Sequence, residues 1–393
     1  MKYREDKRSG NQLSILGFGC MRLPGSLGRV DIQKTEPLLL KAIEKGVNYF
    51  DTAYLYPGSE DAIGQIFEKH ALHDKVFIAT KLPHMMCKTY EDFDKYFDIQ
   101  KKRLRAKKIN YYFIHNISAL EQWTRLLDLG IEKWIKSKKD SGEINQIGFS
   151  YHGSKNDFGL LLDAYDWDFC QIQYNYINTN YQAGVDGLKN AAKRGLPVFI
   201  MEPLLGGRLA VGLPKKAETI FKEQNSERSP ASWAMKWLFN QPEVTLILSG
   251  MNSMEQLEDN INTADSSVPN MLSETEMETF DKVIRVFNES YKIPCTGCNY
   301  CMPCPKQINI PACFAAYNTS YSIGLKDGIG QYMISASGLS KTPHFVSDCI
   351  KCGKCESHCP QQIPIRESLT SVKRRLQPFY LKPALSLYQK FAR

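Results

Sequence analysis

The sequence lacks long hydrophobic runs. No window approaches the roughly 18 consecutive apolar residues that a transmembrane helix needs. The polar N-terminus, MKYREDKRSG, contains no apolar core of the kind found in secretion signals. We therefore expect no membrane span and a cytoplasmic location.

The sequence also has little excess charge of either sign. Its 50 basic residues face 42 acidic ones, and the net charge of +8 is spread along the chain. A nucleic-acid-binding protein usually clusters its basic residues on one face, so we expect no nucleic acid partner. The tail RRLQPFYLKPALSLYQKFAR mixes basic and aromatic residues. We expect it to pack as a terminal helix, with contact to a membrane surface or a partner as the alternative.

Cysteine is scarce in most of the chain. The first 290 residues hold only Cys20, Cys87 and Cys170, whereas nine of the twelve cysteines lie between Cys295 and Cys359. Disulfides are rare in the cytosol, so this concentration indicates metal chemistry. The break in composition predicts two domains, residues 1–288 and 289–393.

The first domain alternates short β-rich runs with amphipathic stretches. Helices are expected at 36–46, 60–71 and 229–241, among others. Alternating strands and helices indicate an α/β fold with a parallel sheet, and eight such units in about 250 residues fit a (β/α)8 TIM barrel. The expected strands are Leu16–Gly19, Asn48–Phe50, Val76–Thr80, Tyr111–Ile114, Gln146–Phe149, Phe169–Gln173, Pro197–Ile200 and Thr245–Leu248. An open doubly wound sheet is the alternative, but the first strand is not followed by the GxGxxG fingerprint of that fold.

The second domain contains two cysteine runs. The first has the spacing C-x2-C-x2-C-x2-C-P and the second C-x2-C-x2-C-x3-C-P, which is the bacterial ferredoxin pattern. The cysteines are Cys295, Cys298, Cys301 and Cys304 in the first run and Cys349, Cys352, Cys355 and Cys359 in the second. They predict two [4Fe-4S] clusters in a small, mostly helical and loop-rich ferredoxin-like domain. Tetrahedral zinc sites are the alternative, although those usually use well-separated CxxC pairs.

Resemblance to two-cluster ferredoxins implies a crossed ligand set, in which the fourth cysteine of each run serves the other cluster. The implied sets are Cys295, Cys298, Cys301 with Cys359, and Cys349, Cys352, Cys355 with Cys304. The first run is one residue shorter before its last cysteine, so Cys304 departs from the pattern. Cys313 lies outside both runs and is expected to be a packed thiol.

Polar residues end three successive predicted strands of the barrel. Asp51, Lys81 and His115 stand at the carboxyl ends of strands two, three and four, and Tyr56 follows in the loop after strand two. In a (β/α)8 enzyme these ends carry the chemistry.

These residues carry a family resemblance. The segment FDTAYLYPGSE, with Lys81 and the IH of FIHN, resembles the catalytic tetrad of aldo-keto reductases, and the likeness spans roughly residues 12–265. The cysteine runs make the chain similar to the branch with a C-terminal 4Fe-4S domain. The resemblance implies that Tyr56 is the general acid or base, with a charged Lys81 favouring its phenolate. It further implies that Asp51 holds Lys81 and that His115 orients a substrate carbonyl.

The same resemblance implies a nicotinamide cofactor across the barrel mouth. Ser150 and Gln171 match positions that hold the carboxamide, and Gly250, Gln256 and Asn260 match the segment at the adenosine end; a barrel-core amide is the alternative for Gln171. Two departures stand out: Met201 replaces a common aromatic residue, and neither Asn252 nor Ser253 is basic. Phosphate recognition favours Arg or Lys, so we write the cofactor as NAD(P). His152 either reaches the site or serves its loop.

A difficulty arises in joining the halves, because clusters pass single electrons whereas nicotinamide exchanges a hydride. We find no flavin signature, so a bridging flavin would come from a partner. One hypothesis is an oxidoreductase acting on a carbonyl or alcohol and exchanging electrons with a ferredoxin or flavoprotein. A second is a carbonyl reductase whose cluster domain is a docking or structural appendage. A third is an electron carrier with a non-catalytic barrel, against which the intact tetrad argues.

Overall fold

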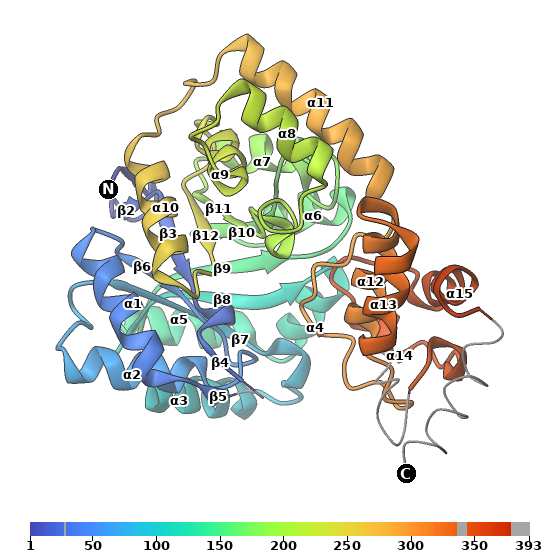
Figure 1. The fold of residues 1–393 in the computed structure, drawn as a ribbon. Coiled ribbons are helices and arrows are strands. Elements are labelled where there is room, and N and C mark those ends of the chain that lie inside the picture. The colour runs from blue at the N-terminus through green and yellow to red at the C-terminus, as the bar shows by residue number, and fades with distance from the viewer. Residues whose placement is uncertain (27–28, 336–343, 379–393) are drawn as a thin grey trace. The chain divides into compact units, whose positions relative to one another are not determined.

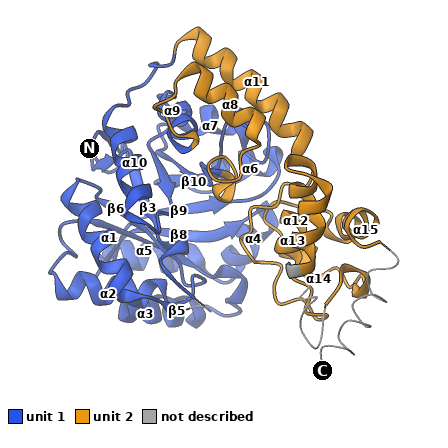
Figure 2. Ribbon diagram, in the orientation of Figure 1, with its two compact units in different colours: residues 1–204, 231–272 blue, residues 205–230, 273–393 orange. Residues whose placement is uncertain are grey.

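The computed structural model describes residues 1–26, 29–335 and 344–378 (Figure 1). They divide into two compact units, residues 1–204 with 231–272 and residues 205–230 with 273–393 (Figure 2). Within the described ranges, no helix is long and apolar enough to cross a membrane. Most of the tail segment considered above, residues 379–393, lies outside the described residues.

The first unit is built on a closed barrel of parallel strands, in the order β10-β11-β12-β3-β6-β7-β8-β9. Its strands are β3 (Leu16–Gly19), β6 (Tyr49–Asp51), β7 (Phe77–Leu82), β8 (Ile109–Ile117), β9 (Ile144–Tyr151), β10 (Phe169–Gln173), β11 (Val198–Met201) and β12 (Leu246–Ser249). The predicted TIM barrel is confirmed and the open doubly wound sheet is wrong. Every predicted strand overlaps an observed one, and β3 and β10 have the predicted bounds.

Large aromatic side chains pack together inside the barrel. Tyr49, Tyr111, Phe169 and Phe199 belong to one fully buried cluster, in which the Tyr49 and Tyr111 ring centroids are 5.2 Å apart. Gly17 has no side chain because a Cβ there would lie 2.8 Å from the Leu248 side chain. Since aromatic rings seal the barrel interior, polar groups are left to the carboxyl ends of the strands.

Helices alternate with these strands, and α3, α5, α7 and α10 pack directly against them. The helices of this unit are α1 (Ile32–Glu44), α2 (Ser59–Lys69), α3 (Glu91–Leu104), α4 (Leu120–Asp128), α5 (Ile131–Asp140), α6 (Lys155–Ala164), α7 (Gly184–Lys193), α9 (Pro230–Phe239) and α10 (Met254–Asp265). The three predicted helices correspond to α1, α2 and α9. Helix α1 begins four residues earlier than predicted because the Asp31 carboxylate accepts a hydrogen bond from the Lys34 backbone N–H and caps it.

Short elements complete the first unit. They are the hairpin strands β1 (Tyr3–Glu5) and β2 (Gln12–Ser14), the hairpin strands β4 (Gly25–Ser26) and β5 (Arg29–Val30), and the 3-10 turns η1 (Cys20–Arg22) and η2 (His84–Met86). The β1–β2 turn is anchored to the barrel, since the Tyr111 hydroxyl donates to the buried Asp6 carboxylate at 2.7 Å.

The second unit is helical, as predicted for the cysteine-rich part. It contains η3 (Leu205–Gly207), α8 (Lys215–Gln224), α11 (Glu274–Ser290), α12 (Ile310–Ser322), α13 (Leu325–Ser335), η4 (Val346–Asp348), α14 (Lys354–Ser357) and α15 (Ile365–Leu376). Helices α8 and α11 pack together through Phe221 and Phe280, whose ring centroids are 5.6 Å apart.

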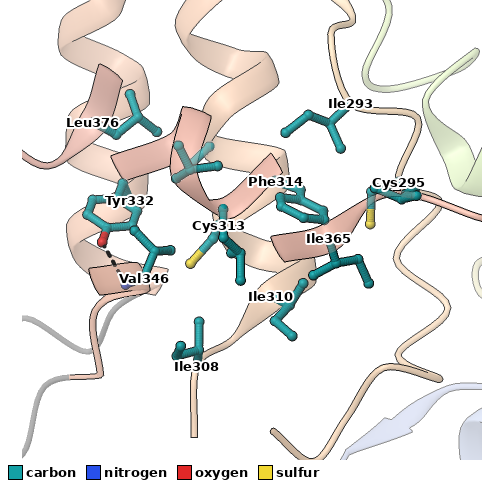
Figure 3. Packing of buried hydrophobic residues seen from close by; sticks show 14 of the residues in the cluster. Ile293, Cys295, Ile308, Ile310, Cys313, Phe314, Tyr332, Val346, Ile365 and Leu376 are labelled. Atoms are coloured by element: carbon teal, nitrogen blue, oxygen red, sulfur yellow. Dashed lines mark hydrogen bonds between the residues drawn. The ribbon is translucent and has the colours of Figure 1, made fainter. Parts of the chain in front are cut away.

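A separate small core holds the cysteine-rich part together. Figure 3 shows Phe314 of α12, Tyr332 of α13 and Ile365 and Leu376 of α15 gathered around the buried Cys313. The Tyr332 hydroxyl accepts a hydrogen bond from the Val346 backbone N–H at 3.1 Å, which ties α13 to η4. Cys313 is fully buried, so the expected packed thiol is confirmed.

Candidate functional site

A buried ion pair lies at the carboxyl ends of β6 and β7. The Lys81 ammonium donates to Asp51 Oδ1 at 2.5 Å and to the Thr52 carbonyl at 2.8 Å. Both side chains are at most 4% exposed. Adjacent parallel strands make this contact, because Asp51 is in register with Ala79, two residues before Lys81.

Burial and pairing act in opposite directions on this pair. Burial lowers the pKa of Lys81, and the Asp51 carboxylate opposes that shift. Burial likewise raises the pKa of Asp51, against the Lys81 charge. Each group therefore depends on the other to stay charged in a site that excludes water.

Tyr56 and His115 complete the group predicted from sequence. Lys81 Nζ lies 5.0 Å from the centroid of the Tyr56 ring, and the His115 ring meets the Tyr56 ring edge-on with centroids 6.0 Å apart. Tyr56 is half-buried in the loop between β6 and α2. The structure thus brings Tyr56 of this loop together with the three residues predicted at strand ends, Asp51, Lys81 and His115.

A β-bulge sets the position of His115. The pairing of β8 with β9 shifts register between Ile114 and Ile117, and Asn116 has a φ of 56°. The Ser150 hydroxyl accepts the Asn116 backbone N–H at 2.8 Å and so holds the bulge. A bulge re-aims the side chains beside it. His115 is 4% exposed, and burial followed by the Lys81 charge holds its pKa well below the usual value.

Gln171, on β10, joins the same network. Its side-chain amide donates to Asp51 Oδ2 at 3.2 Å, and the residue is 2% exposed. Gln171 is in register with Ser150 on β9. Both residues are predicted cofactor contacts. In the structure Gln171 also bonds Asp51, and Ser150 also holds the bulge beside His115.

The remaining predicted cofactor residues lie at the connection from β12 to α10. Gln256 Oε1 accepts the Asn252 backbone N–H at 3.1 Å, and the buried Asn260 donates to the Ser249 hydroxyl at 2.9 Å. Gly250 is exposed, and a Cβ on it would lie 3.4 Å from the Cβ of Arg22. A basic residue, Arg22, therefore lies beside Gly250. The neighbouring Asn252 and Ser253 are not basic.

A buried polar network behind Lys81 was missed by the sequence analysis. Gln100 on α3 donates to Glu60 Oε1 at 2.8 Å and to the Lys81 carbonyl at 3.0 Å. The Thr80 hydroxyl donates to Glu60 at 2.6 Å, and the Tyr112 hydroxyl donates to Gln100 at 2.7 Å. All four residues are at most 2% exposed. Glu60, Thr80 and Tyr112 lie in or beside segments that the sequence analysis singled out, but no local pattern indicated that Gln100 of α3 joins them.

Two further histidines follow the strands on either side of β8, the strand that carries His115. His84 follows β7 and His152 follows β9, and both are buried. Burial lowers the pKa of each to about 4. Both interact electrostatically with His115. His84 and His152 therefore lie near His115.

The eight motif cysteines line two separate cavities in the second unit. One cavity is lined by Cys295, Cys298, Cys301 and Cys359. The other is lined by Cys304, Cys349, Cys352 and Cys355, with Cys301 also touching it. Electrostatic interactions divide in the same way: Cys301 interacts with Cys295, Cys298 and Cys359, and Cys355 with Cys349 and Cys304.

The four motif cysteines of each cavity suit an iron–sulfur cluster. Across the described residues, no group of three or more His, Cys, Asp or Glu side chains could hold a metal ion. Four thiols around an open cavity fit the ligand number of a [4Fe-4S] cluster.

Comparison with known proteins agrees with both halves of this geometry. Residues 15–285 match the model of the aldo/keto reductase family, and residues 294–363 match that of the 4Fe-4S dicluster domain. Similar proteins include an aldo-keto reductase of Gibberella moniliformis, 27% identical over an alignment of 230 residues; the match covers 55% of this chain and 67% of that protein. The uncharacterized oxidoreductase YrpG of Bacillus subtilis is 24% identical over an alignment of 310 residues, and the match covers 68% of this chain and 92% of that protein.

A solved structure shares the fold. It is the holo form of an aldo-keto reductase from Bacillus halodurans, with a TM-score of 0.59 and 21% identity. The match covers 72% of this chain and 96% of that one. At this identity the likeness supports the barrel architecture and no finer conclusion.

Proposed function

Since the chain belongs to the aldo/keto reductase family and also carries a 4Fe-4S dicluster domain, we propose that it is an NAD(P)-dependent oxidoreductase acting on a carbonyl or alcohol. The observation that carries this proposal is the buried Asp51–Lys81 pair beside the Tyr56 and His115 rings. We take residues 1–288 as the reductase domain and 289–393 as the cluster domain of a cytoplasmic protein.

Tyr56 donates the proton that carbonyl reduction requires. The hydride to the carbonyl carbon would come from a nicotinamide held at the barrel mouth. As the proton leaves Tyr56, negative charge develops on the phenol oxygen, and the Lys81 ammonium beside the ring stabilises it. Asp51 keeps Lys81 charged and in place. In the oxidation direction Tyr56 takes the proton back.

His115 orients the substrate rather than supplying the proton. Its pKa lies well below the usual range because of burial and the Lys81 charge, so the imidazole is neutral near pH 7. A neutral imidazole still donates one hydrogen bond, which suits a substrate carbonyl next to Tyr56.

The nicotinamide would be held by residues that already support the tetrad. Gln171 donates one of its two amide hydrogens to Asp51. Its side chain keeps a second donor and an acceptor that can bind the nicotinamide carboxamide. A Ser150 hydroxyl that accepts from Asn116 can still donate its own proton. The donor chemistry therefore fits. Gly250, Gln256 and Asn260 would contact the adenosine end.

In the second unit, we assign Cys295, Cys298, Cys301 and Cys359 to one [4Fe-4S] cluster and Cys304, Cys349, Cys352 and Cys355 to the other. The support is the division of these thiols between two cavities. The clusters would exchange electrons with a partner such as a ferredoxin or a flavoprotein. The alternative is an electron-transfer or docking protein whose barrel is a non-catalytic scaffold.

A Tyr56→Phe variant tests the catalytic assignment. It should lose aldehyde reduction about 10²- to 10⁴-fold, the range for a missing general acid, while it still quenches NADPH or NADH fluorescence. Tyr54→Phe, in the same loop and also half-buried, is the matched control and should keep its activity. Aldehyde reduction by the Tyr56 variant at the parent rate would overturn the assignment. A parent protein that binds neither nucleotide would favour the scaffold alternative.

A further inference from the structure

The two cysteine-lined cavities differ in charge. The cavity of Cys304, Cys349, Cys352 and Cys355 is also lined by Lys306, Lys354, His358 and Arg366, and no acidic side chain is among its described lining residues. The cavity of Cys295, Cys298, Cys301 and Cys359 has no Lys, Arg, His, Asp or Glu among the described residues that line it. Only the first cavity therefore has a charged border.

The same cavity is the more open to solvent at its cysteines. Cys352 is exposed, whereas Cys295 is buried and the other cysteines of both cavities are partly covered. Ile350, between Cys349 and Cys352, is 57% exposed. An exposed apolar side chain next to an exposed cysteine is suited to direct contact with another molecule.

Three lysines border this opening. Lys306, Lys351 and Lys354 are all exposed, and two of them line the cavity while Lys351 lies between Ile350 and Cys352. Arg366 adds no net charge, because it pairs with Glu356 at 2.7 Å. We call Lys306, Lys351 and Lys354, with Ile350 and Cys352 between them, the lysine face.

We propose that the lysine face is the docking surface for a small acidic one-electron carrier protein. Protein interfaces commonly place an apolar centre inside a polar rim, and Ile350 with its three lysines has that arrangement. Opposite charge steers such a carrier and raises its association rate by 10- to 10³-fold. The inference rests on the proposed function, because it requires a cluster on Cys304, Cys349, Cys352 and Cys355.

The transfer itself is simple to balance. One electron leaves the reduced carrier, which is thereby oxidised, and is gained at the cluster site next to the lysine face. No bond forms or breaks and no proton moves. An exposed cysteine ligand shortens the path, so the electron enters at this site rather than at the uncharged cavity.

The experiment measures electron transfer into the cluster-loaded full-length protein. The probe is a reduced acidic plant-type [2Fe-2S] ferredoxin, mixed anaerobically in a stopped-flow spectrometer at several ionic strengths. The reduced methyl viologen cation serves as a second electron donor of opposite charge. We expect the ferredoxin rate constant to fall steeply with added salt, because salt screens charges over about 10 Å at 0.1 M.

Charge reversal tests the location. The variant Lys306→Glu, Lys351→Glu, Lys354→Glu should reduce ferredoxin-driven transfer at least tenfold at low salt and should not slow methyl viologen. The matched control, Lys133→Glu, Lys215→Glu, Lys216→Glu, changes the net charge equally at exposed lysines elsewhere and should stay within twofold of the parent. If charge reversal lowers iron content, the glutamine versions of the three lysines replace it, with a smaller decrease expected.

The outcomes separate this inference from the proposed function. Equal slowing in both triple variants, or a ferredoxin rate without salt dependence, would refute the docking surface and leave the oxidoreductase intact. Loss of transfer only in the lysine-face variant, with methyl viologen unaffected, supports it. A parent protein that binds no iron would instead overturn the proposed clusters, and this inference would fall with them.

Discussion

Replacing Asp51 by asparagine removes the carboxylate that pairs with the Lys81 ammonium and leaves the Thr52 carbonyl as its neutral partner. The variant leaves a cation that is 1% exposed with neutral partners. Breaking a buried ion pair in this way costs about 3–5 kcal/mol. The same loss would lower the pKa of Lys81 further, because the opposite charge that touches the ammonium would then be gone. This shift adds to the lowering that burial already causes.

The expected result is a less stable protein whose deficit depends on pH. The pKa of Lys81 in the folded variant lies below its value of about 10.4 in the unfolded chain, so the unfolded chain binds the proton more tightly. This difference costs no stability only at a pH where the amine is neutral in both states. The deficit should therefore be small above about pH 10 and should grow as the pH falls towards the lowered pKa. Urea unfolding of the Asp51→Asn variant at pH 7 should show a loss of about 3–5 kcal/mol, and carbonyl reduction should fall with it.

A second variant provides the control. The double variant Asp51→Asn, Lys81→Met carries no charge at these two buried positions. It should be more stable than Asp51→Asn alone, because apolar replacement of a buried pair is often neutral or favourable. An Asp51→Asn variant within about 1 kcal/mol of the parent would refute the reasoning. A double variant less stable than the single one would refute it as well.

Three other predictions follow from the described contacts. Cys359→Ser should lower the iron content by about half, since it removes a thiol from one cavity, whereas Cys313→Ala should keep it; equal iron in both would contradict the ligand sets. The free energy of unfolding should drop as the pH falls from about 6.5 to 4, by about 3 kcal/mol for each of His84 and His152, because only the unfolded state binds their protons there. Urea titrations across that pH range, repeated on the His152→Gln variant, measure the contribution of His152. A free energy of unfolding that does not change between pH 6.5 and 4 would contradict the prediction. Gln100→Leu should cost about 1–3 kcal/mol by leaving buried groups unpaired and should lower kcat more than KM, whereas an unchanged kcat would show that this network does not position Lys81.

Local patterns predicted the barrel because each of its units is locally encoded. Strands β3 and β10 matched their predicted bounds, and the other six differ only at their ends. The eight runs are short, apolar and β-rich, and the stretches between them are amphipathic, so each segment carries its own signal. Strand ends then mark the barrel mouth, which explains why Asp51, Lys81 and His115 were recognised from their positions alone.

The supporting contacts of the site were not predictable in this way. Gln100 reaches Glu60 and Lys81 from a different helix, and the bulge at His115 depends on Ser150 of the next strand. Such contacts join segments that are 19 to 40 residues apart. A one-dimensional pattern does not record which side chains face each other across that distance.

The sequence by itself determined which groups the protein possesses and how they are spaced along the chain: two dense cysteine runs, eight strand-helix units and polar residues at successive strand ends. Tertiary structure alone decided which of them meet. Cys359 lines a cavity with Cys295, Cys298 and Cys301, and Gln171 bonds Asp51 across the barrel. The physical reason is that spacing within a motif is set by local backbone geometry, whereas contact between distant residues is set by barrel closure and by packing of the helical core.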